Sequence, residues 1–322
     1  MTLNGAGTLS IDAEAGHGIV SKDDVIITSG TYDITAASHG ISGKDRVGIA
    51  NGSFTIVSGK DGIHAENTED TSLGYVYLEN GTIEITKSYE GLEGETVTIS
   101  GGEIQLVASD DGVNAAGGND QSGMSTFSGG HGGDKFASNS SGSITISGGT
   151  LYVNAEGDGI DSNGSITMTG GEVYVLGPNS TGNGMLDYDS EATISGGTFI
   201  AAGSSGMAQN FGDSSTQGSI LVSVEQQEAG SIVKLIDENK KELLSWTAEK
   251  SFDCVLISCP DIQKGSTYTI SAGASQTEVT MDSLLYGAGT EGGKGAGSRR
   301  NGGNREFNRE NQEEPSTAEN AT

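Results

Sequence analysis

The sequence predicts an all-β fold, a single-stranded parallel β-helix of about eight coils with ~22 residues each, followed by a C-terminal antiparallel β module. Three observations favour this fold. The chain of 322 residues contains 53 Gly and only 3 Pro, it is only 33% hydrophobic, and one short motif recurs at regular spacing. A chain with so few apolar residues buries them efficiently only when a repeated unit stacks on its neighbours.

The repeated motif is a polar residue, a glycine and an apolar residue. Its first three glycines, Gly18, Gly40 and Gly62, lie 22 residues apart, and two insertions interrupt the later spacing. We expect one motif in each coil. The copies are His17-Gly18-Ile19, His39-Gly40-Ile41, Asp61-Gly62-Ile63, Glu90-Gly91-Leu92, Asp111-Gly112-Val113, Asp158-Gly159-Ile160, Asn183-Gly184-Met185 and Ser205-Gly206-Met207.

Two short alternating segments follow each motif, and a Gly-Gly corner separates them, as in "SITMTGGEVYVLG" at 165–177. Alternation with a period of two indicates strands that bury one face. Each coil therefore contributes three strands, and equivalent inward positions stack into ladders with a spacing of about 4.8 Å. One predicted ladder comprises Tyr32, Phe54, Ile83, Ile104, Leu151, Val173 and Phe199.

The pattern divides the chain into three parts. Residues 1–216 carry the predicted β-helix, with a Gly/Ser-rich insertion at 117–142. Residues 217–286 leave the repeat and are typical of antiparallel strands, and we expect them to cover the open edge of the last coil, which would otherwise invite aggregation. Residues 287–322 contain mostly Gly, Asn, Arg and Glu, and we expect them to be a disordered tail.

The formal net charge is -28. A chain this acidic repels nucleic acid and anionic membrane surfaces, and no apolar run reaches the length of a transmembrane helix. The first residues are strand-like and polar and do not resemble a signal peptide, so we expect the true N-terminus and the export signal to lie upstream. We expect a monomer that inserts into no membrane through this segment.

Acidic residues gather at two positions of the motif. The position before the glycine carries Glu90, Asp111 and Asp158, and the second position after it carries Glu93, Asn114, Asp161 and then Leu186. Carboxylates about 5 Å apart repel one another unless they are protonated, hydrated or bridged by a cation. Hard oxygen ligands at that density suit Ca²⁺. The predicted calcium ligands are Glu90, Glu93, Asp110, Asp111, Asn114, Asp158, Asp161 and Asp187.

The alternative explanation for these acids is that they are solvated corner residues, because Asp and Asn tolerate turn backbone. A second outward column places Tyr152 and Tyr174 side by side on one strand face. A flat aromatic surface can stack against sugar rings, so both are candidate carbohydrate-binding residues. The alternative for the two tyrosines is a cross-strand pair that supports the sheet, or a patch beneath the 117–142 insertion.

Enzyme signals are weaker. "GHG" at 16–18 and "DDG" at 110–112 are similar to two motifs of the polygalacturonase active site. Their order along the chain differs from that in polygalacturonases, however, and the sequence contains no Arg-Ile-Lys motif. A pectate-lyase-like site needs an Arg or Lys base, and Arg46 lies several coils from the acids, with Lys60 and Lys87 nearer. His17 and His39 are expected to stack as neighbours, but two histidines without a third ligand make a poor transition-metal site.

Four segments resemble one known family: "SYEGLEGETVTISGG" (88–102), "ASDDGVNAAGGND" (108–120), "NAEGDGIDSNGSITMTGG" (154–171) and "GNGMLDYDSEATISGGTFIAAGSSGMAQ" (182–209). Over residues 16–285 the chain resembles the carbohydrate-binding-domain family of bacterial secreted and lipid-anchored proteins. The resemblance implies a right-handed parallel β-helix of pectate-lyase-like shape and an association with Ca²⁺. It also implies binding of plant cell-wall polysaccharides, including polygalacturonate and cellulose, without established catalysis.

The function expected from the sequence is non-catalytic, Ca²⁺-dependent binding of plant cell-wall polysaccharide, either acidic pectin-type polymer, cellulose or both, at the bacterial cell surface. Two alternatives remain open. The first is a Ca²⁺-dependent enzyme similar to pectate lyase. The second is a structural or adhesive surface protein in which Ca²⁺ only stabilises the coils.

Overall fold

The computed structural model describes residues 1–70, 72–115 and 142–287. The described residues form strands and connecting turns, and they contain no helix. The all-β class is therefore confirmed. The predicted insertion at 117–142 and the predicted tail at 287–322 lie outside the described residues, apart from Gly142 and Gly287.

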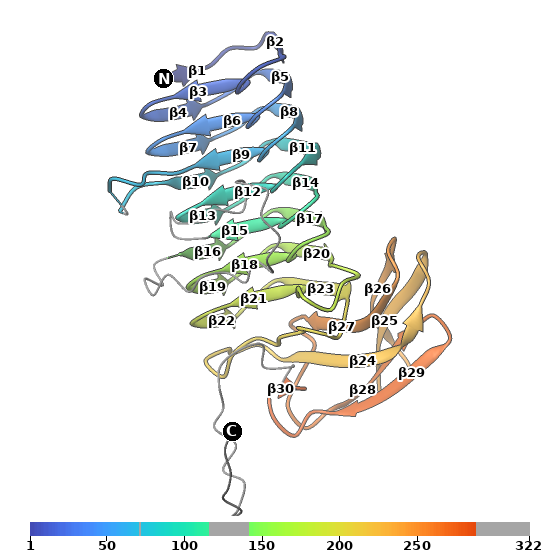
Figure 1. The fold of residues 1–322 in the computed structure, drawn as a ribbon. Coiled ribbons are helices and arrows are strands. Elements are labelled where there is room, and N and C mark those ends of the chain that lie inside the picture. The colour runs from blue at the N-terminus through green and yellow to red at the C-terminus, as the bar shows by residue number, and fades with distance from the viewer. Residues whose placement is uncertain (71, 116–141, 288–322) are drawn as a thin grey trace, which may run out of the picture. The chain divides into compact units, whose positions relative to one another are not determined.

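Three sheets are built from strands that recur at every third place along the chain (Figure 1). Sheet A contains β1 (Thr2–Leu3), β4 (Asp24–Ile27), β7 (Arg46–Ile49), β10 (Tyr75–Leu78), β13 (Thr96–Ile99), β16 (Ser143–Ile146), β19 (Ser165–Met168) and β22 (Glu191–Ile194). Sheet C contains β3 (Ile19–Ser21), β6 (Ile41–Gly43), β9 (Ile63–Ala65), β12 (Leu92–Gly94), β15 (Val113–Ala115), β18 (Ile160–Ser162) and β21 (Leu186–Tyr188).

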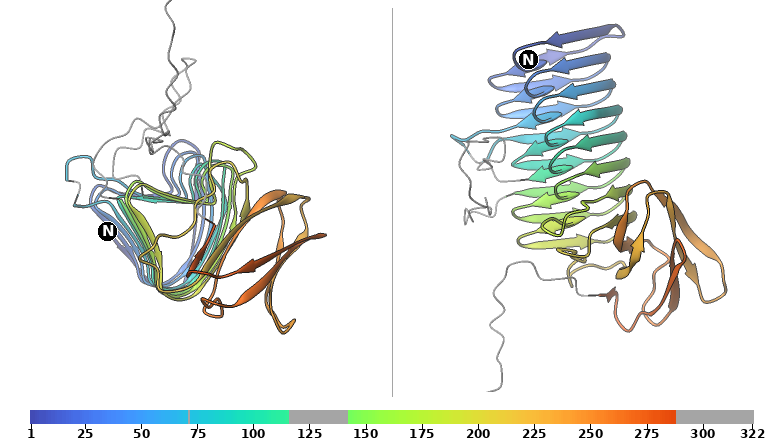
Figure 2. Two further views of the ribbon diagram at one scale, coloured as in Figure 1. Left: turned by 90° about the horizontal axis from the view of Figure 1, so that it is seen from below. Right: turned by 45° about the vertical axis from the view of Figure 1, so that its right-hand side comes forward.

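Sheet B is the largest of the three. Its repeated strands are β2 (Thr8–Ala13), β5 (Thr31–Ala36), β8 (Ser53–Ser58), β11 (Thr82–Ser88), β14 (Glu103–Ala108), β17 (Thr150–Ala155), β20 (Glu172–Leu176) and β23 (Thr198–Gly203). We call one passage through sheets A, B and C a coil, so that coil 1 is β1 to β3 and coil 7 is β19 to β21. The coils superimpose in the view along the stack (Figure 2).

The register of the strands confirms the predicted ladder. Tyr32 pairs with Phe54, Phe54 with Ile83, and the same parallel register continues through Ile104, Leu151 and Val173 to Phe199. These inward side chains are almost completely buried in one core cluster enclosed by the three sheets. Period-2 alternation in β5, β8 and β14 therefore directs apolar residues into the core and polar residues outward.

The C-terminal strands extend sheet B and add a fourth sheet. β27 (Phe252–Ser258) pairs antiparallel with β23 and with β24 (Ser219–Gln227), and β24 pairs with β30 (Leu285–Tyr286). The edge that β23 presents is therefore covered. Sheet D is antiparallel and contains β26 (Glu242–Ala248), β25 (Ser231–Asp237), β28 (Thr267–Ala272) and β29 (Ser275–Thr280). A second core cluster joins sheet D to the outer face of β20 and β23.

Glycines allow the coils to turn and to approach one another. Gly102, at a Gly-Gly corner, has a φ of 91°, in the left-handed region that favours glycine. Gly159, in the repeated motif, is required for a different reason. A β-carbon at Gly159 would collide with the carbonyl oxygen of Met185 and with a methyl group of Val175. The recurring glycines are therefore a condition of close stacking.

Candidate functional site

The polar side chains of the motif form two parallel rows at the turns that lead from sheet B into sheet C. The first, which we call the turn row, is the residue before the motif glycine. Its members are His17, His39, Asp61, Glu90, Asp111 and Asp158. The second, the strand row, is the middle residue of each sheet C strand. Its members are Val20, Ser42, His64, Glu93, Asn114, Asp161 and Asp187.

The structure corrects the strand row at coil 7. The repeat spacing aligned Leu186 with Asp161, whereas the sheet pairs Asp161 with Asp187 and Ile160 with Leu186. The reason is a longer turn before β21, in which Met185 is also buried in the core. Asp187, one of the predicted ligands, therefore continues the acidic row directly.

Three of the predicted ligands meet in coils 5 and 6. Asp111, Asp158 and Asp161 each offer a carboxylate oxygen, and these oxygens all lie within 4.8 Å of one another. An ion at equal distance from three such oxygens would lie at most about 2.8 Å from each, so a small inward movement of the side chains would give the calcium–oxygen distance of 2.3–2.6 Å. We call these three residues the acid cluster.

Backbone hydrogen bonds hold the acid cluster in place. The backbone N–H of Asp158 donates to Oδ1 of Asp111 at 2.5 Å, and the backbone N–H of Gly184 donates to Oδ1 of Asp158. Each of these two turn-row carboxylates therefore accepts a hydrogen bond from the turn of the next coil. These bonds support the turns and also fix the direction of the carboxylates, so they agree with both a structural role and a metal-binding role.

Glu90 and Glu93 meet Asp61 in a second group, in which the three carboxylate oxygens again lie within 4.8 Å of one another. Glu90 and Asp61 are 1% and 4% exposed. The Asn114 side-chain amide donates to Oε1 of Glu90 at 3.3 Å. Burying carboxylates is costly in free energy unless they are paired, hydrogen-bonded or coordinated. These buried carboxylates therefore need such partners more than carboxylates at a solvent-exposed turn would.

The remaining predicted ligands flank the acid cluster. Asp110 and Asp111 both direct an oxygen at Gly157, where a β-carbon would overlap them. Asp187 accepts a hydrogen bond from the backbone N–H of Tyr188 at 2.9 Å and another from the side-chain amide of Gln209. Asp110 and Asp187 therefore lie beside the acid cluster, but they are not among its three mutually close oxygens.

Histidines occupy the other end of the rows, and the sequence interpretation had assigned them no site. The rings of His17 and His39 stack with centroids 5.0 Å apart, and those of His39 and His64 with centroids 4.1 Å apart. Nδ1 of His39 lies 2.7 Å from Oδ2 of Asp61. Nε2 of His64 lies 3.2 Å from Oε2 of Glu93. The stacking of His17 on His39 agrees with the sequence prediction, whereas the third ring, that of His64 in the neighbouring row, was missed.

Burial controls the protonation of these groups. Burial and the neighbouring His39 lower the pKa of His64 to about 4, so its imidazole is neutral at neutral pH. Burial alone would raise the pKa of Asp61, but hydrogen bonds with His39 and Glu93 outweigh it and leave that pKa below its ordinary value. The histidine end therefore combines a neutral imidazole with an ionised carboxylate.

The two predicted carbohydrate-binding tyrosines are adjacent on sheet B, where β17 pairs with β20. Both also pack against the second core cluster. The ring of Tyr174 lies 6.1 Å from that of Trp246 in β26, and the hydroxyl of Tyr152 donates to Oε2 of Glu249 at 3.3 Å. Burial, together with Glu249, raises the pKa of Tyr152 to about 12. The tyrosines therefore share their aromatic surface with sheet D.

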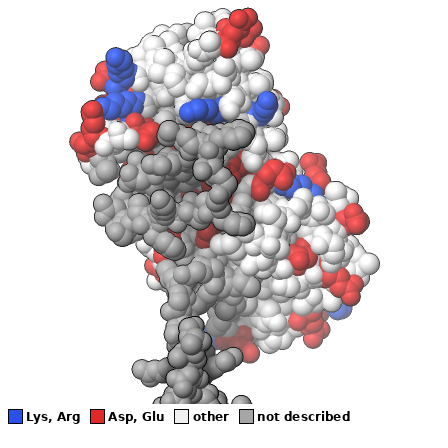
Figure 3. Space-filling view, in the orientation of Figure 1, with Lys and Arg blue, Asp and Glu red and all other residues white. Residues whose placement is uncertain are grey.

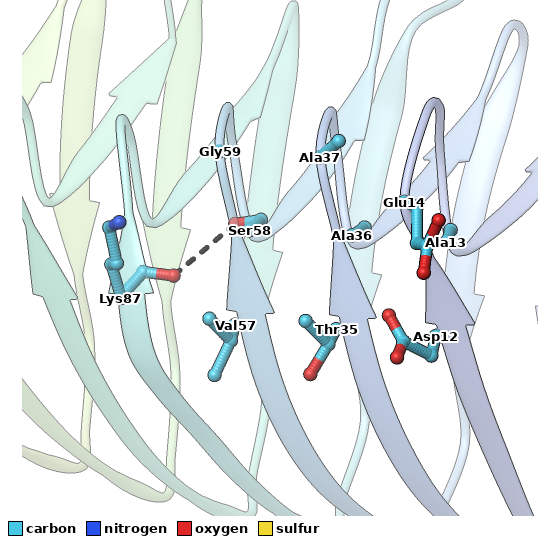
Figure 4. Close-up of a pocket in the computed structure, with 10 residues that line it drawn as sticks. All are labelled: Asp12, Ala13, Glu14, Thr35, Ala36, Ala37, Val57, Ser58, Gly59 and Lys87. Atoms are coloured by element: carbon cyan, nitrogen blue, oxygen red, sulfur yellow. Dashed lines mark hydrogen bonds between the residues drawn. The ribbon is translucent and has the colours of Figure 1, made fainter.

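A pocket of about 310 Å³ lies at the ends of β2, β5, β8 and β11, before the turn row. Figure 4 shows the carboxylates of Asp12 and Glu14 at one end and Lys87 at the other, with Thr35 and Val57 between them. This volume is at the lower end of the range for small-molecule sites. Hydrogen-bonding groups around a partly apolar floor would suit a sugar ring.

The basic residues considered for a lyase lie in other places. Arg46 is in sheet A and pairs with Asp24 at 2.5 Å. Lys87 lines the pocket, and Lys60 precedes Asp61 in the turn row. In the face shown in Figure 3, most of the visible Lys and Arg gather over the N-terminal coils, whereas Asp and Glu extend to the C-terminal strands. Arg46, the single arginine in the sequence of residues 1–216, therefore belongs to another sheet and is already paired.

Comparisons with known proteins identify a family for this chain. A family model described as "Carbohydrate-binding domain-containing protein" matches residues 1–184, more than half of the chain. No curated protein and no solved structure matches the chain. Within the described residues, no helix is sufficiently long and apolar to span a membrane.

Proposed function

Because the chain belongs to the carbohydrate-binding domain-containing family, we propose that it is a non-catalytic, Ca²⁺-dependent binder of plant cell-wall polysaccharide at the bacterial surface. Family membership supports carbohydrate binding. The observation that supports calcium is the acid cluster, in which Asp111, Asp158 and Asp161 bring three oxygens within 4.8 Å of one another. We propose that these residues hold the ion, with Asp187, Asp110 and Asn114 beside them.

The polysaccharide that we propose is acidic and binds through the calcium ion. A net charge of -28 repels a polymer of uronate residues unless cations intervene. A calcium ion in the acid cluster would supply that positive charge, and its remaining coordination positions would accept uronate carboxylates. Pectin-type polymer is therefore our first choice and cellulose our second. The pocket beside Glu14 and Lys87 is a candidate place for a sugar unit of the same polymer.

We further propose that the coils wind as a right-handed parallel β-helix of the pectate-lyase-like shape. The support is the parallel pairing of strands that are three apart in the chain. Connections between parallel strands of one sheet are right-handed in nearly all proteins. This winding stacks successive coils about 4.8 Å apart, which is the spacing that an extended row of carboxylates needs in order to share cations.

Retention on immobilised polygalacturonate tests the function. The protein is stripped of metal with a chelator and applied with and without Ca²⁺. We expect retention only with Ca²⁺, and a strong loss of retention in Asp161→Asn. The matched control is Glu103→Gln, which makes the same change of charge at an exposed position in β14. Equal retention of the two variants would contradict a role for the acid cluster.

The same experiment separates the alternatives. Unsaturated product, detected by ultraviolet absorbance, would identify a lyase and overturn the non-catalytic proposal. Calcium binding without retention on pectin or cellulose would favour a structural or adhesive protein. Calcium-independent retention on cellulose would keep the carbohydrate function and reject the role of the metal.

A further inference from the structure

The N-terminal half of the two rows carries a different set of ligands from the acid cluster. His39, Asp61 and His64 each offer one ligand atom, and these three atoms lie within 4.8 Å of one another. The three residues come from two adjacent coils, His39 from coil 2 and the others from coil 3. No member of this set was among the ligands predicted from the sequence.

We propose that His39, Asp61 and His64 form a site for a divalent transition metal such as Zn²⁺, separate from the calcium site. Glu93, from coil 4, is the natural fourth ligand, because its Oε2 already lies 3.2 Å from Nε2 of His64. Two imidazoles and one or two carboxylates are a donor set that zinc commonly uses. Imidazole nitrogen favours borderline metals, whereas calcium prefers oxygen, so the two ends of the rows select different ions.

The geometry requires only a small rearrangement of the side chains. Neighbouring ligand atoms around a tetrahedral zinc ion are roughly 3.4 Å apart for bonds of 2.0–2.2 Å. Nδ1 of His39 and Oδ2 of Asp61 are closer than this already, at 2.7 Å. The stacked rings of His39 and His64 would have to separate slightly, and each lies at a turn or in a short strand at the surface of the stack.

The burial of these side chains favours tight binding of a metal ion at the proposed zinc site. His39 is 9% exposed and Asp61 is 4% exposed. Most of the rearrangement and desolvation needed for metal binding is therefore complete before the ion arrives. A further imidazole nitrogen, Nδ1 of His17, is buried beside this group and has no hydrogen-bond partner among the described residues. His17 stacks on His39 and so packs against one side of the site.

A metal at this position would bind side chains from coils 2, 3 and 4 at once. It would strengthen the side-chain contacts that already join these coils, His39 with Asp61 and His64 with Glu93. Zinc should therefore raise the melting temperature of the metal-free protein, and Ca²⁺ should not replace it at this site.

Spectroscopic titration tests the proposal. The full chain, stripped of metal, is titrated with Co²⁺, whose visible absorption reports nitrogen coordination, and with Zn²⁺ by calorimetry. We expect one equivalent to bind. His39→Gln and His64→Gln should each weaken binding by at least about 100-fold, because losing a ligand exceeds the 10–100-fold cost of losing its supporting partner. The control Asp161→Asn should weaken Ca²⁺ binding and leave Co²⁺ and Zn²⁺ binding unchanged.

Two results would overturn the proposal: no Co²⁺ spectrum and no Zn²⁺ heat with the native chain, or unchanged zinc affinity in both histidine variants. Circular dichroism establishes that the variants are folded. If they are not folded, modification of the native chain with diethylpyrocarbonate replaces them. Zn²⁺ should then protect His39 and His64 in peptide mass spectra, and equal modification with and without Zn²⁺ would reject the site.

Discussion

The two ends of the same pair of rows have the same backbone and different chemistry. At coils 2 and 3 the rows carry His39, Asp61 and His64, and at coils 5 and 6 they carry Asp111, Asp158 and Asp161. Strand pairing and turn hydrogen bonds are equivalent at the two ends. If both proposed sites are correct, substitutions at two positions per coil determine which kind of ion each end binds.

The two ends should respond differently to acid, and this is the largest effect that we expect. The pKa of His64 is about 4 in the folded protein and 6.5 in its unfolded reference. The unfolded chain therefore binds a proton first as the pH falls, and stability that is present above pH 6.5 is lost between pH 6.5 and pH 4. The loss is about 3 kcal/mol.

Urea unfolding of the metal-free protein at a series of pH values measures this loss. In His64→Gln the decline between pH 6.5 and pH 4 should become much shallower. His17→Gln is the matched control. Burial also lowers the pKa of His17, but its side chain is less enclosed than that of His64, so this substitution should change the decline less. The same slope in the native chain and in His64→Gln would contradict the assignment to His64.

Calcium should stabilise the acid end alone. At a Ca²⁺ concentration 100 times the dissociation constant, the free energy of unfolding should rise by about 2.7 kcal/mol. Asp161→Asn should lose this increment, whereas without metal it should be as stable as the native chain or more so, because one of three mutually repelling carboxylates is gone. Thermal melts with Ca²⁺ and with chelator measure both quantities. A calcium increment that survives in Asp161→Asn would place the ion elsewhere.

The motif glycines should be needed equally at both ends. A β-carbon at Gly40 would collide with Ile56 and the carbonyl of Gly62, and one at Gly159 with Val175 and the carbonyl of Met185. Alanine at either position should cost about 1–3 kcal/mol, the usual range for overpacking. A β-carbon at Gly16 would meet no atom within 4 Å, so Gly16→Ala is the control and should be nearly neutral. The urea midpoints of Gly40→Ala, Gly159→Ala and Gly16→Ala measure these costs. A large difference between Gly40→Ala and Gly159→Ala would show that the two ends do not depend equally on their motif glycines.

The sequence was sufficient for the features that repeat. Alternating apolar residues and motif glycines determined the ladder from Tyr32 to Phe199, because each coil faces the same steric environment as its neighbours. It was not sufficient where the repeat changes. The extra turn residues before β21 shifted the strand row by one position, and only the sheet pairing identifies Asp187 as the neighbour of Asp161.

Contacts that cross the repeat were also beyond the sequence. His39 belongs to the turn row and His64 to the strand row, one coil further along, so their stacking is diagonal and no single column contains both. Similarly, nothing in the spacing of Tyr152 and Tyr174 indicates that Trp246, from β26, packs against Tyr174. Long-range packing of this kind depends on how the C-terminal strands fold back on sheet B.

The smallest effect concerns those tyrosines. The hydroxyl of Tyr174 donates to Oε2 of Glu172 at 3.1 Å on an exposed surface, so Tyr174→Phe should cost less than about 1 kcal/mol and leave polysaccharide retention unchanged. Tyr174→Ala removes the ring as well. If the ring stacks on sugar, as the sequence predicts, retention falls in Tyr174→Ala with Ca²⁺ still bound. If stability alone falls, the ring serves only the contact with Trp246, and binding depends on the two rows alone.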